Sequence, residues 1–175
     1  MALEIERRFL VAGDGWRAHV RSTSPLRQGY LAGGPEGFTV RVRQAADAAW
    51  LTLKAAASAD GLIRHEFEYP IPLADAEALL ALAPRQLAKC RYGLDLPGGD
   101  WVLDVFEGAN APLIVAEVEM AEADVVLTPP AWCVQEITGR HELSNAALSA
   151  RPLEAWSADE RDPLLAVLLP GSRPL

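Results

Sequence analysis

Charged side chains recur at every second position in the strand-like segments of this sequence. The first segment carries Glu4, Glu6 and Arg8, and a later one carries Arg41 and Arg43 beside valines. Because side chains two positions apart lie on the same face of a β-strand, each segment presents one charged face and one apolar face. The pattern favours a β-sheet with one face in polar surroundings and the other face in apolar surroundings.

The alternation predicts eight strands separated by turn residues. They cover Leu3–Val11, Leu26–Leu31, Phe38–Gln44, Trp50–Ala55, Leu62–Ile71, Gln86–Leu96, Asp100–Glu107 and Pro112–Met120. Helical spacing of apolar residues predicts a helix over Leu73–Ala83, and a short helical turn is expected around Trp16–Val20. Asp162 and Pro163 are interpreted as the N-cap and first residue of a short apolar helix that Pro170 ends. Consecutive antiparallel strands of this kind are typical of a barrel or a sandwich.

The charged faces hold equal numbers of bases and acids. The bases are Arg8, Arg41, Arg43, Lys54, Arg64, Lys89 and Arg91, and the acids are Glu4, Glu6, Glu66, Glu68, Asp104, Glu117 and Glu119. One interpretation is a solvated face whose cross-strand ion pairs contribute about 0.2–1 kcal/mol each. The other is a closed barrel with every charged face turned inward, which is costly unless the lumen is wet or holds a ligand and a metal. The apolar faces, which need cover, and the segregation of acids and bases by strand favour the barrel.

The composition narrows the class of protein. With 175 residues, 50% of them hydrophobic, the chain is expected to form one domain with a substantial core. Its apolar runs are too short to span a membrane, and its charged N-terminus does not resemble a signal peptide. Cys90 and Cys133 lack metal-ligand spacing and fit a reducing cytoplasm. A net charge of −8 argues against nucleic-acid binding but leaves room for a small basic pocket.

The ordered set of motifs resembles the CYTH superfamily, the triphosphate tunnel metalloenzymes. Glu4-Ile5-Glu6-Arg7-Arg8 occupies the place of the family's N-terminal ExExK motif. The further matches, in family order, are Arg27–Leu31, Arg41–Arg43, Leu51–Lys54, Arg64–Tyr69, Lys89–Tyr92, Asp104–Phe106 and Glu117–Glu119. Thr138-Gly139 and Ser144-Asn145 with Leu148 resemble the segment that closes the family domain. The resemblance covers residues 3–152, so we expect a tunnel domain over residues 1–152 and a tail over residues 153–175.

The resemblance implies a mainly β fold, an eight-stranded antiparallel tunnel barrel with a few covering helices, which binds a triphosphate with Mg²⁺ or Mn²⁺. Arg41, Arg43, Lys54, Arg64, Lys89 and Arg91 would hold phosphate oxygens, with Arg8 as a further candidate. Glu4, Glu6 and Glu119 would hold a first cation, and Glu117, Glu66, Glu68 and Asp104 remain for a second cation or for orienting the attacking water. Arg8, Glu117 and Lys54 are the expected catalytic residues.

One position departs from the family pattern. Arg8 stands where ExExK has its lysine. Arginine keeps the positive charge but does not readily lose a proton, and its planar guanidinium differs from a compact ammonium group. The substitution puts the rate of hydrolysis in doubt more than the binding of the triphosphate.

The implied activity is metal-dependent hydrolysis of a triphosphate, with inorganic tripolyphosphate as the first choice of substrate. Thiamine triphosphate, a nucleoside triphosphate and ATP cyclisation to cAMP remain open, as does a polyphosphate- or nucleotide-binding module without useful turnover. The tail is expected to cover the barrel, plug one tunnel mouth or contact a partner. The oligomeric state stays open, with a homodimer slightly favoured because the tail is rich in leucine.

Overall fold

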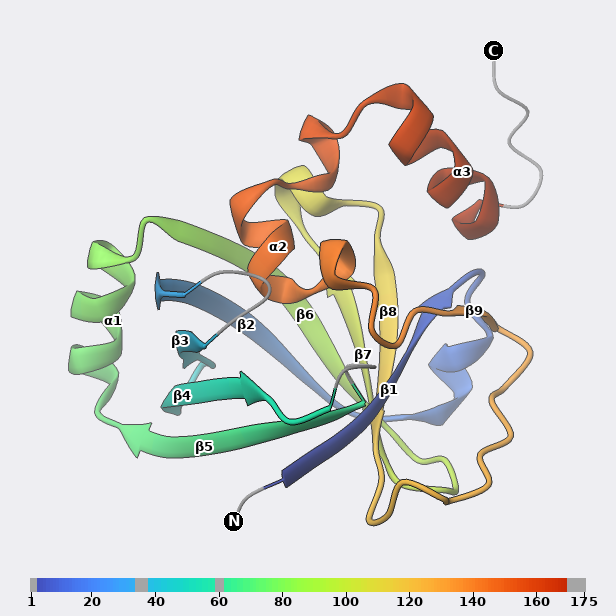
Figure 1. Ribbon diagram of the computed structural model, residues 1–175, viewed down its shortest axis with the longest axis horizontal. Helices are drawn as coiled ribbons and strands as arrows, with labels where there is room; N and C mark the ends of the chain where they lie inside the picture. The colour runs from blue at the N-terminus through green and yellow to red at the C-terminus, as the bar shows by residue number, and fades with distance from the viewer. Residues whose placement is uncertain (1–2, 34–37, 59–61, 170–175) are drawn as a thin grey trace.

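In the computed structural model, eight antiparallel strands close into a barrel (Figure 1), which confirms the predicted fold. The structure describes residues 3–33, 38–58 and 62–169. The strands are β1 (Leu3–Val11), β2 (Val20–Ala32), β3 (Thr39–Gln44), β4 (Ala49–Ala56), β5 (Ile63–Ile71), β6 (Arg85–Leu94), β7 (Asp100–Phe106) and β8 (Ile114–Glu119). Their order is β5-β4-β3-β2-β6-β7-β8-β1, and a β5–β1 pairing closes the barrel.

Strand β1 lies at the closure of the barrel and pairs with three neighbours. Leu3–Ile5 pair with β5, Glu6–Leu10 pair with β8, and Phe9–Val11 pair with β9 (Cys133–Glu136). The alternation pattern did not predict β9, whose four residues are too few to establish a period of two. β9 lies outside the closed ring, so β1 is tied to the chain that follows the barrel.

The second strand is longer than its sequence pattern indicated. Prediction placed it at Leu26–Leu31, whereas β2 begins at Val20 and includes Pro25. Most side chains of its first half are exposed, so no apolar alternation marks them. Pairing with β6 along this length, with Pro25 opposite Cys90, satisfies the backbone instead.

The barrel interior changes from charged to apolar along its length. Leu10 continues the face of β1 that carries Glu4, Glu6 and Arg8, and it packs with Phe106 and Val115 in a buried cluster. This cluster extends to Leu143, Leu148, Leu153 and Trp156 from the segment after the barrel. That segment comprises η3 (His141–Leu143), α2 (Asn145–Ala150) and η4 (Leu153–Ala155). The charged stretch of the lumen therefore ends against an apolar floor.

Separate elements cover the outer face. Helix α1 (Leu73–Leu82), within one residue of its predicted range, packs on Val42 and Ala49. Gly29 permits this close approach, because a Cβ there would lie 2.7 Å from the Cβ of Ala83. The short helix η1 (Gly15–His19), predicted as a turn, buries Trp16 in the cluster around Trp101. A further short helix, η2 (Gly108–Asn110), precedes β8.

The last helix begins earlier than its sequence signals indicated. α3 spans Ala158–Leu168, and Ser157 and Glu160 form a capping box at its N-terminus. The predicted N-cap at Asp162 is therefore wrong, since Pro163 lies inside the helix. The predicted stop at Pro170 lies outside the described residues. None of the helices within residues 3–33, 38–58 and 62–169 is long and apolar enough to cross a membrane.

Leu164 and Leu168 of α3 join the apolar cluster that closes the barrel, so the core crosses residue 152. Both leucines are buried inside the chain, whereas Leu169 is 45% exposed, and the homodimer favoured from the sequence stays a prediction. In Figure 1, α3 lies beyond α2 on the side of the barrel away from α1.

We expect Leu168→Ala to lower the free energy of unfolding by roughly 2–4 kcal/mol, because it opens a cavity in this cluster. Leu169 is the matched control, since it is 45% exposed whereas Leu168 is 5% exposed. Leu169→Ala should cost less than about 1 kcal/mol. Urea denaturation followed by circular dichroism measures both, and equal losses would show that α3 does not anchor the core.

Candidate functional site

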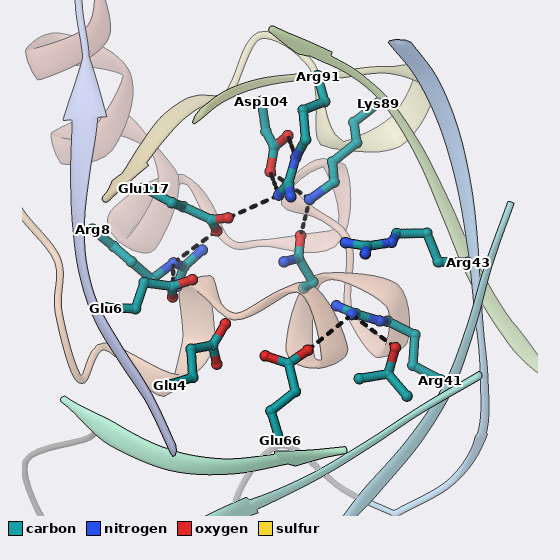
Figure 2. A network of polar contacts seen from close by, with 12 residues as sticks. Glu4, Glu6, Arg8, Arg41, Arg43, Glu66, Lys89, Arg91, Asp104 and Glu117 are labelled. Atoms are coloured by element: carbon teal, nitrogen blue, oxygen red, sulfur yellow. Dashed lines mark hydrogen bonds and ion pairs between the residues drawn. The ribbon is translucent and has the colours of Figure 1, made fainter. Parts of the chain in front are cut away.

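A cavity of about 350 Å³ occupies the charged part of the barrel. The inward faces of the strands supply its polar lining, and Figure 2 shows these side chains converging from the surrounding strands. Of the site residues predicted from sequence, those that line the cavity are Glu4, Glu6, Arg8, Arg41, Arg43, Lys54, Arg64, Glu66, Glu68, Arg91, Glu117 and Glu119. Lys89 and Asp104 are not among the lining residues.

The acidic wall of the cavity is formed where β1 pairs with β8. Glu6 lies opposite Glu119, and Arg8 lies opposite Glu117. Burial and the like charges of Glu117 and Glu4 raise the pKa of Glu6. Partial burial and the charges of Glu4 and Glu66 likewise raise the pKa of Glu119. Several carboxylates of this wall therefore lie close enough to repel one another.

Basic side chains of β4 and β5 bridge these carboxylates. Lys54 Nζ donates to both carboxylate oxygens of Glu4 at 2.8 Å. Arg64 Nη2 donates to Glu6 Oε1 at 2.8 Å. Within the part of the chain that the structure describes, Glu119 makes no ion pair. A cation entering the cavity would therefore meet one carboxylate with no basic partner.

Arg41 and Arg43 of β3 lie across the lumen from Glu6 and Glu117 (Figure 2). Arg41 Nη2 donates to Thr52 Oγ1 at 3.0 Å, and Arg43 Nη2 donates to Glu68 Oε1 at 2.9 Å. Burial and the neighbouring charge of Arg41 lower the pKa of Arg43. The two guanidinium groups therefore face the lumen with Glu66 and Glu68 beside them.

Arg8, Glu117 and Arg91 form a continuous charged chain in the cavity wall. Arg8 Nε donates to Glu117 Oε1 at 3.1 Å, and Arg91 Nη2 donates to Glu117 Oε2 at 2.9 Å. Although burial acts in the opposite direction, the charges of Arg8, Lys89 and Arg91 hold the pKa of Glu117 well below its usual range. Glu117 is therefore ionised and a weak base.

Lys89 and Asp104 form a fully buried ion pair behind this chain. Arg91 also pairs with Asp104, through a 2.8 Å bond from Nε to Oδ1. Arg91 and Lys89 lower the pKa of Asp104 against the effect of burial, whereas burial lowers the pKa of Lys89 to about 8. The burial of both side chains favours a supporting role for Asp104 and Lys89 over the metal- and phosphate-binding roles predicted from sequence.

The segment that follows β9 and contains η3, α2 and η4, here called the closing segment, also lines the cavity. No role was predicted for its lining residues. They are Gly139, Arg140, His141, Ser144, Asn145 and Ala146. Their only signal in the sequence was the resemblance of Thr138-Gly139 and Ser144-Asn145 to the end of the family domain. The topology brings them to the site because β9 and η3 return the chain to the barrel.

Arg8 connects the cavity wall to this closing segment. Its Nη2 donates to the backbone carbonyl of Leu143 at 3.1 Å, and its backbone N–H donates to Thr138 Oγ1 at 3.1 Å. A guanidinium can hold Glu117 and the Leu143 carbonyl at once through separate nitrogens. A lysine would have to reach both acceptors from a single nitrogen on a shorter side chain.

The donor chemistry fits a hard divalent cation, because carboxylate oxygens are the protein ligands that Mg²⁺ and Mn²⁺ prefer. Burial and the like charges of neighbouring glutamates raise the pKa values of Glu6 and Glu119, and a bound cation would offset the repulsion between these carboxylates. In residues 3–33, 38–58 and 62–169, however, no three acidic, His or Cys side chains already form a metal-binding group. Glu4 and Glu6 would first have to exchange their basic partners for the metal.

The CYTH domain family matches residues 2–147, so the chain belongs to this family. The inorganic triphosphatase of Nitrosomonas europaea is 40% identical over 152 residues, which cover 83% of this chain and 96% of that protein. The inorganic triphosphatase of Acetivibrio thermocellus is 33% identical over 154 residues, covering 87% and 96%. The solved structure of the inorganic triphosphatase NE1496 has a TM-score of 0.59 at 36% identity, covering 83% of this chain and 97% of that one.

We expect Arg8→Lys to lower the free energy of unfolding by about 1 kcal/mol, because it cannot keep both the Glu117 and the Leu143 contacts. Arg27→Lys is the control, since Arg27 is exposed on the same barrel. Thermal unfolding measures the difference, and hydrogen exchange should localise added opening to residues 139–146. Unchanged exchange there would contradict the link between Arg8 and the closing segment.

Proposed function

We propose that this chain hydrolyses inorganic tripolyphosphate to pyrophosphate and phosphate inside the charged barrel, using Mg²⁺ or Mn²⁺. The observation that carries the proposal is a barrel cavity lined by several arginines and Lys54 together with several carboxylates. A triphosphate carries dense negative charge, and its hydrolysis depends mainly on positioning and charge neutralisation. The names of two curated relatives support the choice of substrate.

Binding is proposed to proceed by exchange of ion pairs. Arg41, Arg43, Lys54, Arg64 and Arg91 would hold phosphate oxygens, with Arg8 as the further candidate. Each now contacts a carboxylate that the incoming oxygens would replace. Glu4, Glu6 and Glu119 would hold the cation, with Glu66 and Glu68 available for a second one. Bound metal would neutralise phosphate charge and polarise the bond that breaks.

In the hydrolytic step, a water oxygen forms a bond to phosphorus as the P–O bond to the leaving pyrophosphate breaks. Glu117 is well placed to orient this water but is too weak a base to take its proton completely, because three basic groups stabilise its charge. The proton is therefore proposed to leave with the products. Arg8 and Lys54, beside Glu117 and Glu4, would stabilise charge that develops during the reaction.

The lining favours inorganic tripolyphosphate over a nucleotide. Tyr30 is the one Phe, Trp or Tyr side chain among the described lining residues, and it is only 2% exposed. A nucleobase would find little aromatic surface on which to stack. The acidic balance of the chain argues against a nucleic-acid partner, and we propose a cytoplasmic location from its two free cysteines.

We expect phosphate release from tripolyphosphate to require Mg²⁺ or Mn²⁺ and to disappear in Glu6→Ala. Arg41→Ala should lower kcat/KM by about tenfold to a hundredfold, because it removes charged hydrogen bonds to substrate. Arg27→Ala is the matched control on the outer face of β2. ATP, thiamine triphosphate and pyrophosphate should run alongside as competing substrates. Faster release from ATP would indicate a nucleotide enzyme, and binding without turnover would indicate a polyphosphate-binding module.

We expect Glu119→Gln to raise the metal concentration for half-maximal activity by about tenfold, because it removes one charged ligand. Glu107→Gln, an exposed change just beyond β7, is the control. Since the pKa of Glu119 is raised, protons compete with the metal as pH falls, and the wild-type protein should need more metal in acid. Metal titrations at several pH values measure this, and an identical response in both variants would exclude Glu119 from the metal site.

A further inference from the structure

The side chain of Asn145 lies between the buried Lys89–Asp104 pair and the cavity. Asn145 is the first residue of α2 and lines the cavity. Its Oδ1 accepts a hydrogen bond from Lys89 Nζ at 3.2 Å. The same ammonium group contacts Asp104, and both of those charged side chains are fully buried.

The contact with Lys89 fixes which way the Asn145 amide is turned. An ammonium group has only hydrogen-bond donors, so it must face the oxygen of the amide and not the nitrogen. The NH2 group then points away from Lys89. Among the described residues this group has no hydrogen-bond partner, and it is not one of the buried unpartnered atoms. It is therefore a free donor on a residue of the cavity wall.

We propose that the Asn145 amide donates to a phosphate oxygen of bound tripolyphosphate, and that Lys89 is a positioning residue that orients this amide. The inference rests on the proposed function and adds Asn145, from the closing segment, to the proposed substrate-binding residues. Asp104 holds Lys89 in place, so the buried pair acts on the substrate through Asn145 and makes no contact with phosphate.

A neutral donor complements the charged groups of this cavity. Arg41, Arg43 and Arg91 each give up a contact with a carboxylate when they bind a phosphate oxygen. The Asn145 NH2 group gives up no partner within the described part of the chain, and its oxygen keeps the bond to Lys89. Because the amide is already oriented, little conformational freedom is lost when the substrate binds.

Asn145→Ala tests the donor directly. Calorimetric titration with tripolyphosphate in EDTA measures affinity without turnover, and Asn145→Ala should raise Kd about tenfold or more. Ser149→Ala is the control, because Ser149 lies on the same helix, donates to the carbonyl of Ala146 at 2.7 Å and is not a lining residue. Asn145→Ala should raise Kd without lowering Tm more than this control does. An unchanged Kd overturns the proposal.

A double-mutant cycle separates positioning from direct phosphate binding. Lys89→Met leaves Asp104 paired with Arg91 and frees the Asn145 amide to rotate. It should raise Kd several-fold in the wild-type background and much less when Asn145 is already alanine. Equal effects in the two backgrounds would mean that Lys89 acts independently of Asn145, which overturns the positioning role. If Lys89→Met does not fold, the Asn145→Ala result alone decides whether the amide is a donor.

The wild-type titration distinguishes failure of this inference from failure of the proposed function. Wild-type protein that neither binds tripolyphosphate in EDTA nor hydrolyses it with metal overturns both. If the wild-type protein hydrolyses tripolyphosphate with metal but does not bind it in EDTA, an unchanged KM in Asn145→Ala overturns the role of Asn145. Tight wild-type binding that Asn145→Ala leaves intact overturns only the role of Asn145. In steady-state kinetics, the expected signature of Asn145→Ala is a raised KM with a smaller change in kcat.

Discussion

Charge balance inside the barrel is the constraint on which the rest of this structure depends. Every inward base predicted from the sequence contacts at least one carboxylate on another strand of the barrel. An isolated buried charge would cost several kcal/mol, so removing one member leaves a penalty on its partner. The barrel geometry, with charged faces inward and apolar outer faces covered by α1 and η1, is the arrangement that makes these pairs possible.

The same balance prepares the cavity for a polyanion and a cation together. A triphosphate alone would displace carboxylates from the arginines and leave these carboxylates unpaired. A cation alone would bind the carboxylates that now contact Lys54 and Arg64, and it would leave these two bases unpaired. Arriving together, the two ligands neutralise both sets of groups. Glu119, which lacks a basic partner among the described residues, biases the acidic wall toward the cation. In the proposed function, metal binding and substrate binding would thus be coupled through ion pairs already present.

Most strands of the barrel could be predicted from the sequence, because polar and apolar residues alternate wherever a strand separates two environments. The sequence identified the inward faces correctly, since Glu4, Glu6 and Arg8 share one face of β1 and line one cavity. It could not give the depth of each charge along the lumen. Lys89 shares a face of β6 with Arg91, and Asp104 lies opposite Arg91 on β7, yet neither is a cavity-lining residue. Strand β9 was not predicted, because its four residues are too few to show an alternation. The start of α3 was predicted at the wrong residue, because Asp162-Pro163 has the sequence of a typical helix N-terminus.

The closing segment contributes residues both to the cavity wall and to the apolar core. Two interior bases reach it: Arg8 through the carbonyl of Leu143 and Lys89 through the side chain of Asn145. Its apolar side chains close the lumen, with Leu143 and Leu148 packed beside Leu10. A displacement of this segment would therefore disturb the Arg8–Glu117 pair and the apolar floor together. The charge network thus holds the apolar floor in register with the cavity through the contacts of Arg8 and Lys89.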